Sequence, residues 1–291
     1  LYLILNLTIA THILFKAYRG EHYNKKFAVP LILISIPAAV GIHTVTAFLF
    51  AGLPARSYWN AAILAPRFLT SAFCSGPAII LVLLQIIRRT TPVKVTNEAL
   101  FKIAELMAYA MFVNLFLFGA EIFRDFYSST REIIHYEYLF GVGRYGDSPI
   151  KIYAWLALMC SVAAFLLFLI PKTRKNLITL NLGAVLIYMG VYIEKGVALV
   201  IPGFTPSTIG EIYHYAPSST ELRVSMGVFG IGAILFTVLV NISTRFVFSN
   251  PKLQGEHHEE EASAAGRGAV GGSVGEGAGS VHVGAGVHAD A

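Results

Sequence analysis

The chain has 291 residues, of which 55% are hydrophobic and 13% are charged, about half the charged share of an ordinary globular domain. This composition leaves too little polar surface to cover a soluble fold. The net charge of +5 comes from Lys and Arg in short clusters between apolar runs, a pattern that orients membrane proteins and gives no support to nucleic-acid binding.

Seven apolar runs are candidate membrane-spanning helices, because crossing about 30 Å of hydrocarbon takes about 20 helical residues. They lie at about residues 1–15, 27–51, 62–87, 101–123, 150–170, 177–201 and 223–248. A membrane β-barrel would instead need short segments of alternating polarity. The sequence therefore predicts an all-α polytopic membrane protein that lies in a lipid bilayer, with a transmembrane helical domain over residues 1–250.

The two ends of the chain differ from this pattern. The first run begins without Met in the middle of an apolar stretch, LYLILNLTIATHILF, so we expect that one or more N-terminal helices are missing. Residues 251–291 are mostly Gly, Ala, Ser, Val and His, with no apolar periodicity. They are predicted to form a disordered tail, in which His257 and His258 are solvated and do not form a dedicated metal site.

Basic residues alternate between the loops. Clusters follow the first, third and fifth runs, namely Lys16, Arg19, Lys25 and Lys26, then Arg88, Arg89 and Lys94, then Lys172, Arg174 and Lys175. The connections at 52–61, 124–149 and 202–222 have few basic residues or balance them with acidic ones. By the positive-inside rule, the first set of loops and the C-terminal tail are predicted to face the cytoplasm, across a prokaryotic cytoplasmic (inner) membrane.

The sequence does not contain the usual ligands of a redox metal centre. Cys74 and Cys160 are its only cysteines and lie far apart within apolar runs, which is too few for an iron–sulfur or zinc ligand set. His12 and His43 lie within predicted spans, but about 15 Å separates them along the membrane normal, which argues against a bis-histidine haem. We therefore expect no haem, iron–sulfur cluster or other metal on this chain, so that any redox metal belongs to a partner.

Ionisable side chains at membrane depth cost about a few kcal/mol each, so each of them indicates either function or a buried pair. Five of them, on four predicted helices, are expected toward the outer face: His43, Arg67, Glu121, Glu194 and Lys195. Trp59, in the adjacent external loop, is expected at the headgroup level or as a roof over this region. A polar pocket within an apolar bundle suits a head group that is both lipid-soluble and protonatable, as a quinone is.

These residues also have structural interpretations. His43 is either a functional group or a hydrogen-bonded packing residue, and Arg67 is either part of the pocket or a side chain that snorkels outward from a helix start. Glu194 and Lys195 are adjacent, so their side chains should diverge by about 100° and not face one partner. Near the opposite end of its helix, Glu105 is either an entry point for protons or half of an interfacial pair.

Two stretches carry a resemblance to a known family. Residues 41–78, GIHTVTAFLFAGLPARSYWNAAILAPRFLTSAFCSGPA, combine a His in one helix, a Trp in the next external loop and the start of the following helix. Residues 192–236, YIEKGVALVIPGFTPSTIGEIYHYAPSSTELRVSMGVFGIGAILF, form the second stretch. Both resemble the NrfD/polysulfide reductase family of membrane subunits, as found in DsrP-like and Hmc-like redox complexes. The likeness covers most of residues 27–248.

The resemblance implies helical bundles of the NrfD type that bind menaquinone or ubiquinone on the periplasmic side. It also implies a ferredoxin-like iron–sulfur subunit docked there, and further redox subunits of the multihaem cytochrome c or molybdopterin type. His43 matches the His that the family places near the quinone, and Arg67 and Ser71 lie on the helix beside it. With Trp59, these are the predicted quinone-binding residues.

For the chemistry we expect His43, Glu121 and Glu194 to act as catalytic residues of a quinol-oxidising or quinone-reducing subunit that is not active alone. The candidates for a proton path are Glu105, Glu121, Glu194 and Lys195, and proton translocation is a hypothesis. Two other functions stay open. One is a secondary transporter, which predicts inverted repeats and a site near the midplane. The other is a structural anchor without a quinone site.

Overall fold

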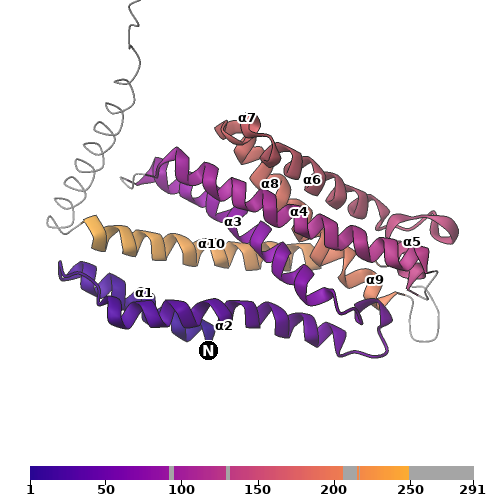
Figure 1. The fold of residues 1–291 in the computed structure, drawn as a ribbon, viewed down its shortest axis with the longest axis horizontal. Coiled ribbons are helices and arrows are strands. Elements are labelled where there is room, and N and C mark those ends of the chain that lie inside the picture. The colour runs from indigo at the N-terminus through magenta and orange to yellow at the C-terminus, as the bar shows by residue number, and fades with distance from the viewer. Residues whose placement is uncertain (92–94, 129–131, 206–214, 216, 249–291) are drawn as a thin grey trace, which may run out of the picture. The chain divides into compact units, whose positions relative to one another are not determined.

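The computed structural model describes residues 1–91, 95–128, 132–205, 215 and 217–248, and within this part of the chain every regular element is helical (Figure 1). The long helices are α1 (Tyr2–Tyr18), α2 (Lys25–Ala51), α3 (Leu64–Thr90), α4 (Asn97–Tyr127), α6 (Lys151–Leu169), α8 (Leu177–Ile193) and α10 (Ser219–Phe248). The shorter ones are η1 (Ser57–Trp59), α5 (Ile133–Phe140), η2 (Gly143–Tyr145), α7 (Pro171–Arg174), η3 (Glu194–Ala198) and α9 (Val200–Phe204).

The predicted all-α membrane fold is confirmed. Six helical segments in the described residues are long and apolar enough to cross a membrane, and α8, η3 and α9 together make one of them, Leu177–Phe204. The first predicted span corresponds to α1, whose 17 residues extend for only about 26 Å and so fall short of the hydrocarbon thickness. The predicted tail 251–291, with His257 and His258, lies outside the described residues, as do Lys94 and parts of the loops 124–149 and 202–222.

The chain forms two compact units. The smaller one comprises residues 3–32 and 230–291, of which 249–291 are outside the described part. In it, the turn after α1 has Gly20 at a φ of 66°. The ring of His12 lies 4.8 Å from that of Phe27, and Lys16 forms an ion pair with Glu21. These contacts join the end of α1 to the start of α2.

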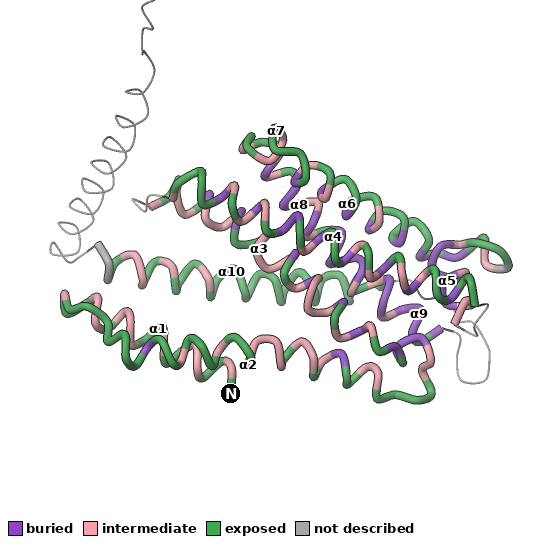
Figure 2. The backbone as a smooth tube through the Cα atoms, viewed as in Figure 1, coloured by how far each residue is buried: buried purple, intermediate pink, exposed green. Residues whose placement is uncertain are grey.

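The larger unit, residues 33–229 with Leu1 and Tyr2, contains a four-helix bundle. Helices α3, α4, α6 and α8 each contact the next, and α8 contacts α3 again, so that they enclose a common core. Figure 2 shows buried positions along all four helices. The core side chains include Leu81, Met107, Phe168 and Ile187, and small residues allow close approach: a Cβ at Gly190 would lie only 2.6 Å from Ser161 Oγ.

A second core at one end of this unit is aromatic and is built from η1, α5 and the η3–α9 segment. Its centre is Trp59, which is 1% exposed. The predicted loop 124–149 is therefore partly structured, because α5 supplies buried residues such as Tyr136 and Leu139 to this core.

The η3–α9 segment departs from regular helix, and side chains satisfy its backbone carbonyls. The carbonyl of Ala198 would normally accept from the N–H four residues later, but that residue is Pro202, which has none. The hydroxyl of Tyr58 donates to Ala198 O instead, at 3.1 Å, and Trp59 Nε1 donates to Leu199 O at 2.9 Å. His135 Nδ1 lies 2.8 Å from Pro202 O and 2.7 Å from Thr205 O.

Candidate functional site

A buried ion cluster joins three elements of the bundle. Arg67 of α3 is 3% exposed. Its Nη1 donates to Glu121 Oε2 on α4, and its Nη2 donates to Glu194 Oε1 in η3 at 2.7 Å. The guanidinium also lies 4.9 Å from the ring centroid of Phe118. Arg67 is therefore a buried partner of two carboxylates, and the interpretation that it snorkels outward is wrong.

Lys195 completes the cluster. Its Nζ donates to Glu194 Oε1 at 3.1 Å and lies 5.2 Å from the ring centroid of Phe68 on α3. Glu194 and Lys195 line different cavities, as expected of adjacent side chains that diverge, but the long lysine side chain also reaches back to Glu194, a bond that was not predicted. With two cations and two carboxylates, the cluster has a formal charge of zero, as a buried set of charges requires.

Two polar side chains extend the cluster and were not predicted. Asn114 of α4 is fully buried, and its Nδ2 donates to Glu194 Oε2 at 3.5 Å. Thr70 of α3 donates to Asn114 Oδ1 at 3.3 Å. The signal in the sequence was a single amide within the apolar stretch MFVNLFLF.

Next to the cluster lies a cavity of about 410 Å³ between α2, α3 and the α8–η3 segment. Its polar lining includes His43, Ser71 and Lys195, and its other walls include Phe68 and Tyr188. His43 is partly exposed to this cavity and forms no hydrogen bond within the part of the chain that the structure describes. An apolar cavity of this size with a few polar groups is typical of a small-molecule site.

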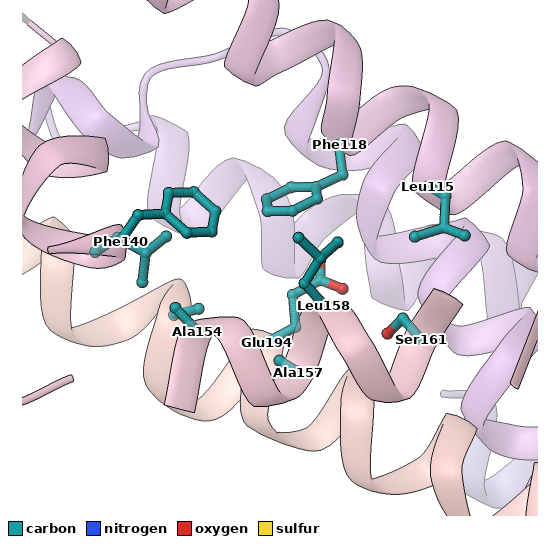
Figure 3. Close-up of a pocket in the computed structure, with 10 residues that line it drawn as sticks. Leu115, Phe118, Phe140, Ala154, Ala157, Leu158, Ser161 and Glu194 are labelled. Carbon is teal, nitrogen blue, oxygen red and sulfur yellow. The ribbon is translucent and has the colours of Figure 1, made fainter. Parts of the chain in front are cut away.

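On the side of α6, Glu194 lines a much smaller cavity of about 10 Å³ (Figure 3). Figure 3 shows the rings of Phe118 and Phe140 at this cavity, together with Ser161 and the carboxylate of Glu194. Such a volume is about that of one water molecule. Glu194 therefore contacts a water-sized cavity, while Lys195, to which it is bonded, lines the large one.

The structure brings most of the predicted site residues together. Arg67, Glu121, Glu194 and Lys195 are bonded to one another, and His43 and Ser71 line the cavity that Lys195 also lines. The gathering of Arg67, Glu121, Glu194 and Lys195 is thus confirmed as a contact network, while their position near the outer face and their chemical roles stay predictions. Ser71 is buried, and its hydroxyl donates to Phe68 O at 2.9 Å.

Two predicted residues lie elsewhere. Trp59 belongs to the aromatic core and is not among the residues that line the cavity beside His43. Glu105 precedes Glu121 by 16 residues on α4, which is about 24 Å along the helix axis. Its carboxylate accepts from Lys102 Nζ and from the hydroxyl of Tyr109, both at 3.1 Å. Glu105 thus forms the interfacial pair, and its role as a proton entry point stays untested.

His135, in the aromatic core, is a further titratable group that the sequence did not single out. The centroid of its ring is 5.0 Å from that of the Tyr58 ring. Burial lowers the pKa of the His135 imidazole, and the hydrogen bonds to the carbonyls of Pro202 and Thr205 offset part of this lowering. Both neighbours of Nδ1 are carbonyl oxygens, so Nδ1 carries the proton. Burial also raises the pKa of the Tyr58 hydroxyl.

No three His, Cys, Asp or Glu side chains gather to hold a metal ion in the described ranges. Cys74 and Cys160 are both buried and unpaired.

Comparison with known proteins identifies similar sequences. The family model described as "Polysulphide reductase, NrfD" matches residues 2–206. The chain is 27% identical to a subunit of the selenate reductase of Mesobacillus selenatarsenatis over 222 residues, which is 72% of this chain and 50% of that protein. It is 26% identical to a putative dimethyl sulfoxide reductase membrane subunit of Halobacterium salinarum over 225 residues, 69% of this chain and 50% of the relative. The chain spans about half the length of the curated relatives it matches.

Proposed function

This chain belongs to the polysulphide reductase NrfD family, and from that premise we propose that it binds a quinone or quinol in the cavity beside His43. The chain is a multi-pass membrane protein related to membrane subunits of reductase complexes. In the proposed function it is the quinol-oxidising or quinone-reducing subunit of a respiratory oxidoreductase, and its ligand is menaquinone or ubiquinone.

The observation that carries this proposal is the pairing of an apolar cavity with a small number of polar groups. A quinone head group needs a flat apolar space and donors for its carbonyl oxygens. The walls formed by Phe68 and Tyr188 supply the first, and the imidazole of His43 supplies a donor. The residues present therefore fit the ligand.

The residues of the chain have separate tasks in this proposal. A bound quinone supplies the exchange of electrons coupled to protons. His43 holds or moves a proton at a ring nitrogen, because an imidazole can donate at one nitrogen and accept at the other. Arg67 keeps the carboxylates of Glu121 and Glu194 in place, and Glu194 lies between Lys195 and the water-sized cavity. Onward proton transfer through Glu194, and translocation as such, belong to the proposal.

The proposed partners follow from the names of the relatives. Both relatives are named as single subunits of a reductase, which implies that other subunits complete those enzymes. We assign electron exchange to a ferredoxin-like iron–sulfur subunit on the periplasmic side, with further redox subunits of the multihaem cytochrome c or molybdopterin type behind it. The alternation of basic loops supports this orientation in a prokaryotic cytoplasmic membrane, with the C-terminus in the cytoplasm.

The test is His43→Ala in the purified complex. We expect loss of quinol-linked activity, while activity with a soluble dye as electron donor or acceptor and assembly of the complex stay normal. His12→Ala is the matched control, because His12 packs against Phe27 in the other unit and should leave both activities unchanged. Full quinol-linked activity in His43→Ala would favour a structural anchor and overturn the proposal.

A further inference from the structure

We propose that the ammonium group of Lys195 contacts the ligand directly, as a hydrogen-bond donor to a carbonyl oxygen of the quinone ring. This inference rests on the proposed function and adds a second ligand-binding residue beside His43. It concerns a neutral, flat ring ligand with two ring oxygens, such as a benzoquinone or naphthoquinone or the corresponding quinol.

The first argument is the position of Lys195. Its side chain is 18% exposed, whereas those of its partner Glu194 and of Arg67, the other cation of the cluster, are 8% and 4% exposed. Since Lys195 lines the cavity of about 410 Å³, this cavity accounts for its exposure. Lys195 is therefore the member of the ion cluster that reaches the space where a ligand would lie.

The second argument is the count of donors. A lysine ammonium has three N–H donors and no acceptor. In the described part of the chain Lys195 makes one hydrogen bond, to Glu194 Oε1, and packs over the ring of Phe68. Two N–H groups remain for an acceptor in the cavity, and a cation without further acceptors in apolar surroundings is unfavourable.

The third argument is the local backbone. The π-helical turn Glu194–Ala198 begins at the two charged residues, and its next residue, Gly196, also lines the cavity. An ideal Cβ on Gly196 would meet no atom within 4 Å, so the absence of a side chain there leaves open space beside Lys195. Single π-turns within helices are rare and frequently mark functional sites.

The charge of Lys195 also suits the chemistry of the proposed ligand. A cation placed in advance beside a carbonyl oxygen stabilises negative charge that develops on that oxygen. Glu194 keeps the ammonium in place. Because Arg67 donates to the same oxygen and holds this carboxylate, Lys195 can bond a ligand without leaving its partner.

The experiment measures binding of two probes to the purified complex in nanodiscs. Menadione has two ring carbonyl groups, and 2-methylnaphthalene has the same carbon skeleton without them. We expect Lys195→Met to weaken menadione binding by about tenfold or more, the usual effect of a lost hydrogen bond to a charged group, and to leave 2-methylnaphthalene binding nearly unchanged. Lys172→Met, at an exposed position in α7, is the matched control and should bind both probes normally.

The outcomes separate this inference from the proposed function. An equal loss of binding for both probes in Lys195→Met would mean that Lys195 only shapes the cavity, and would overturn the inference. Unchanged menadione binding in Lys195→Met, together with lost menadione binding in His43→Ala, would also overturn the inference but leave the proposed function intact. Unchanged binding in both variants would overturn both. If the complex does not assemble with Lys195→Met, the test uses Lys195→Arg, which keeps the charge. A ratio of menadione affinity to 2-methylnaphthalene affinity below that of the wild type supports the inference. A ratio equal to that of the wild type overturns it.

Discussion

The hydroxyl of Tyr58 donates a hydrogen bond to the carbonyl oxygen of Ala198, a residue 140 positions later in the chain. The bond exists because Pro202 cannot supply the N–H that this carbonyl would accept in a regular helix. It connects the loop before α3 to the π-turn that carries Glu194 and Lys195.

Removing this hydroxyl should destabilise the protein. Tyr58→Phe keeps the ring contacts with His135 and Tyr136 but leaves a carbonyl unsatisfied, which costs about 1–3 kcal/mol when the group is buried. We expect a lower midpoint of thermal unfolding in detergent. Tyr127→Phe, at a hydroxyl on a side chain that is 79% exposed, is the control and should melt as the wild type does. Equal midpoints for all three proteins would contradict the structural role of the bond.

Gly203 is needed for the packing of Trp59. A Cβ added at Gly203 would overlap the indole ring, which is itself held by its bond to Leu199. Gly203→Ala should therefore cost about 1–3 kcal/mol through overpacking. Gly119→Ala is the matched control, because a Cβ there meets no atom within 4 Å and alanine favours the interior of α4. Thermal unfolding of both variants tests this, and a stable Gly203→Ala protein would show that the indole can move.

The ion cluster should depend strongly on Arg67. Arg67→Met leaves two carboxylates with one ammonium in a buried site, and breaking a buried ion network by removing one partner costs about 3–5 kcal/mol. We expect little folded protein in size-exclusion chromatography after extraction. Adding Glu121→Gln restores the formal charge to zero and should recover part of the yield. Arg223→Met, at an exposed arginine of α10, should behave as the wild type does. A normal yield of Arg67→Met would mean that the carboxylates are protonated or hydrated.

His135 predicts a dependence of stability on pH. Burial lowers the pKa of its imidazole below the unfolded value of about 6.5, so the unfolded state binds more protons in the window between the two values. The contribution of His135 to stability is complete above about pH 6.5 and is lost as the pH falls through the window to the folded pKa. The carboxylates of Glu132 and Asp125 raise the pKa of His135 in the folded state and so narrow this pH window.

The measurement is the difference in the thermal midpoint between about pH 8 and about pH 5. Glutamine can still donate to the carbonyls of Pro202 and Thr205 but does not titrate, so His135→Gln should lose less stability on acidification than the wild type. The same acid-induced loss in both proteins would assign the effect to other groups.

The sequence predicted the helices well because apolar runs of membrane length are a strong signal. It also predicted that Arg67, Glu121 and Glu194 come together, since the orientation of the spans places them at similar depth. It did not predict that Lys195 bonds to Glu194, because helical periodicity gives the direction in which a side chain leaves the helix and not how far a flexible lysine bends back. Asn114 was missed because an uncharged amide in an apolar run is a weak signal, and His135 because its burial depends on how a loop folds back.

The order of donors and acceptors in the chain has a consequence for biosynthesis. Tyr58, Trp59 and His135 all precede the carbonyls of residues 198–205 that they satisfy. When the ribosome completes the span that Pro202 interrupts, these three side chains have already been made. The interrupted stretch of that span therefore enters the bilayer after these partners have been synthesised.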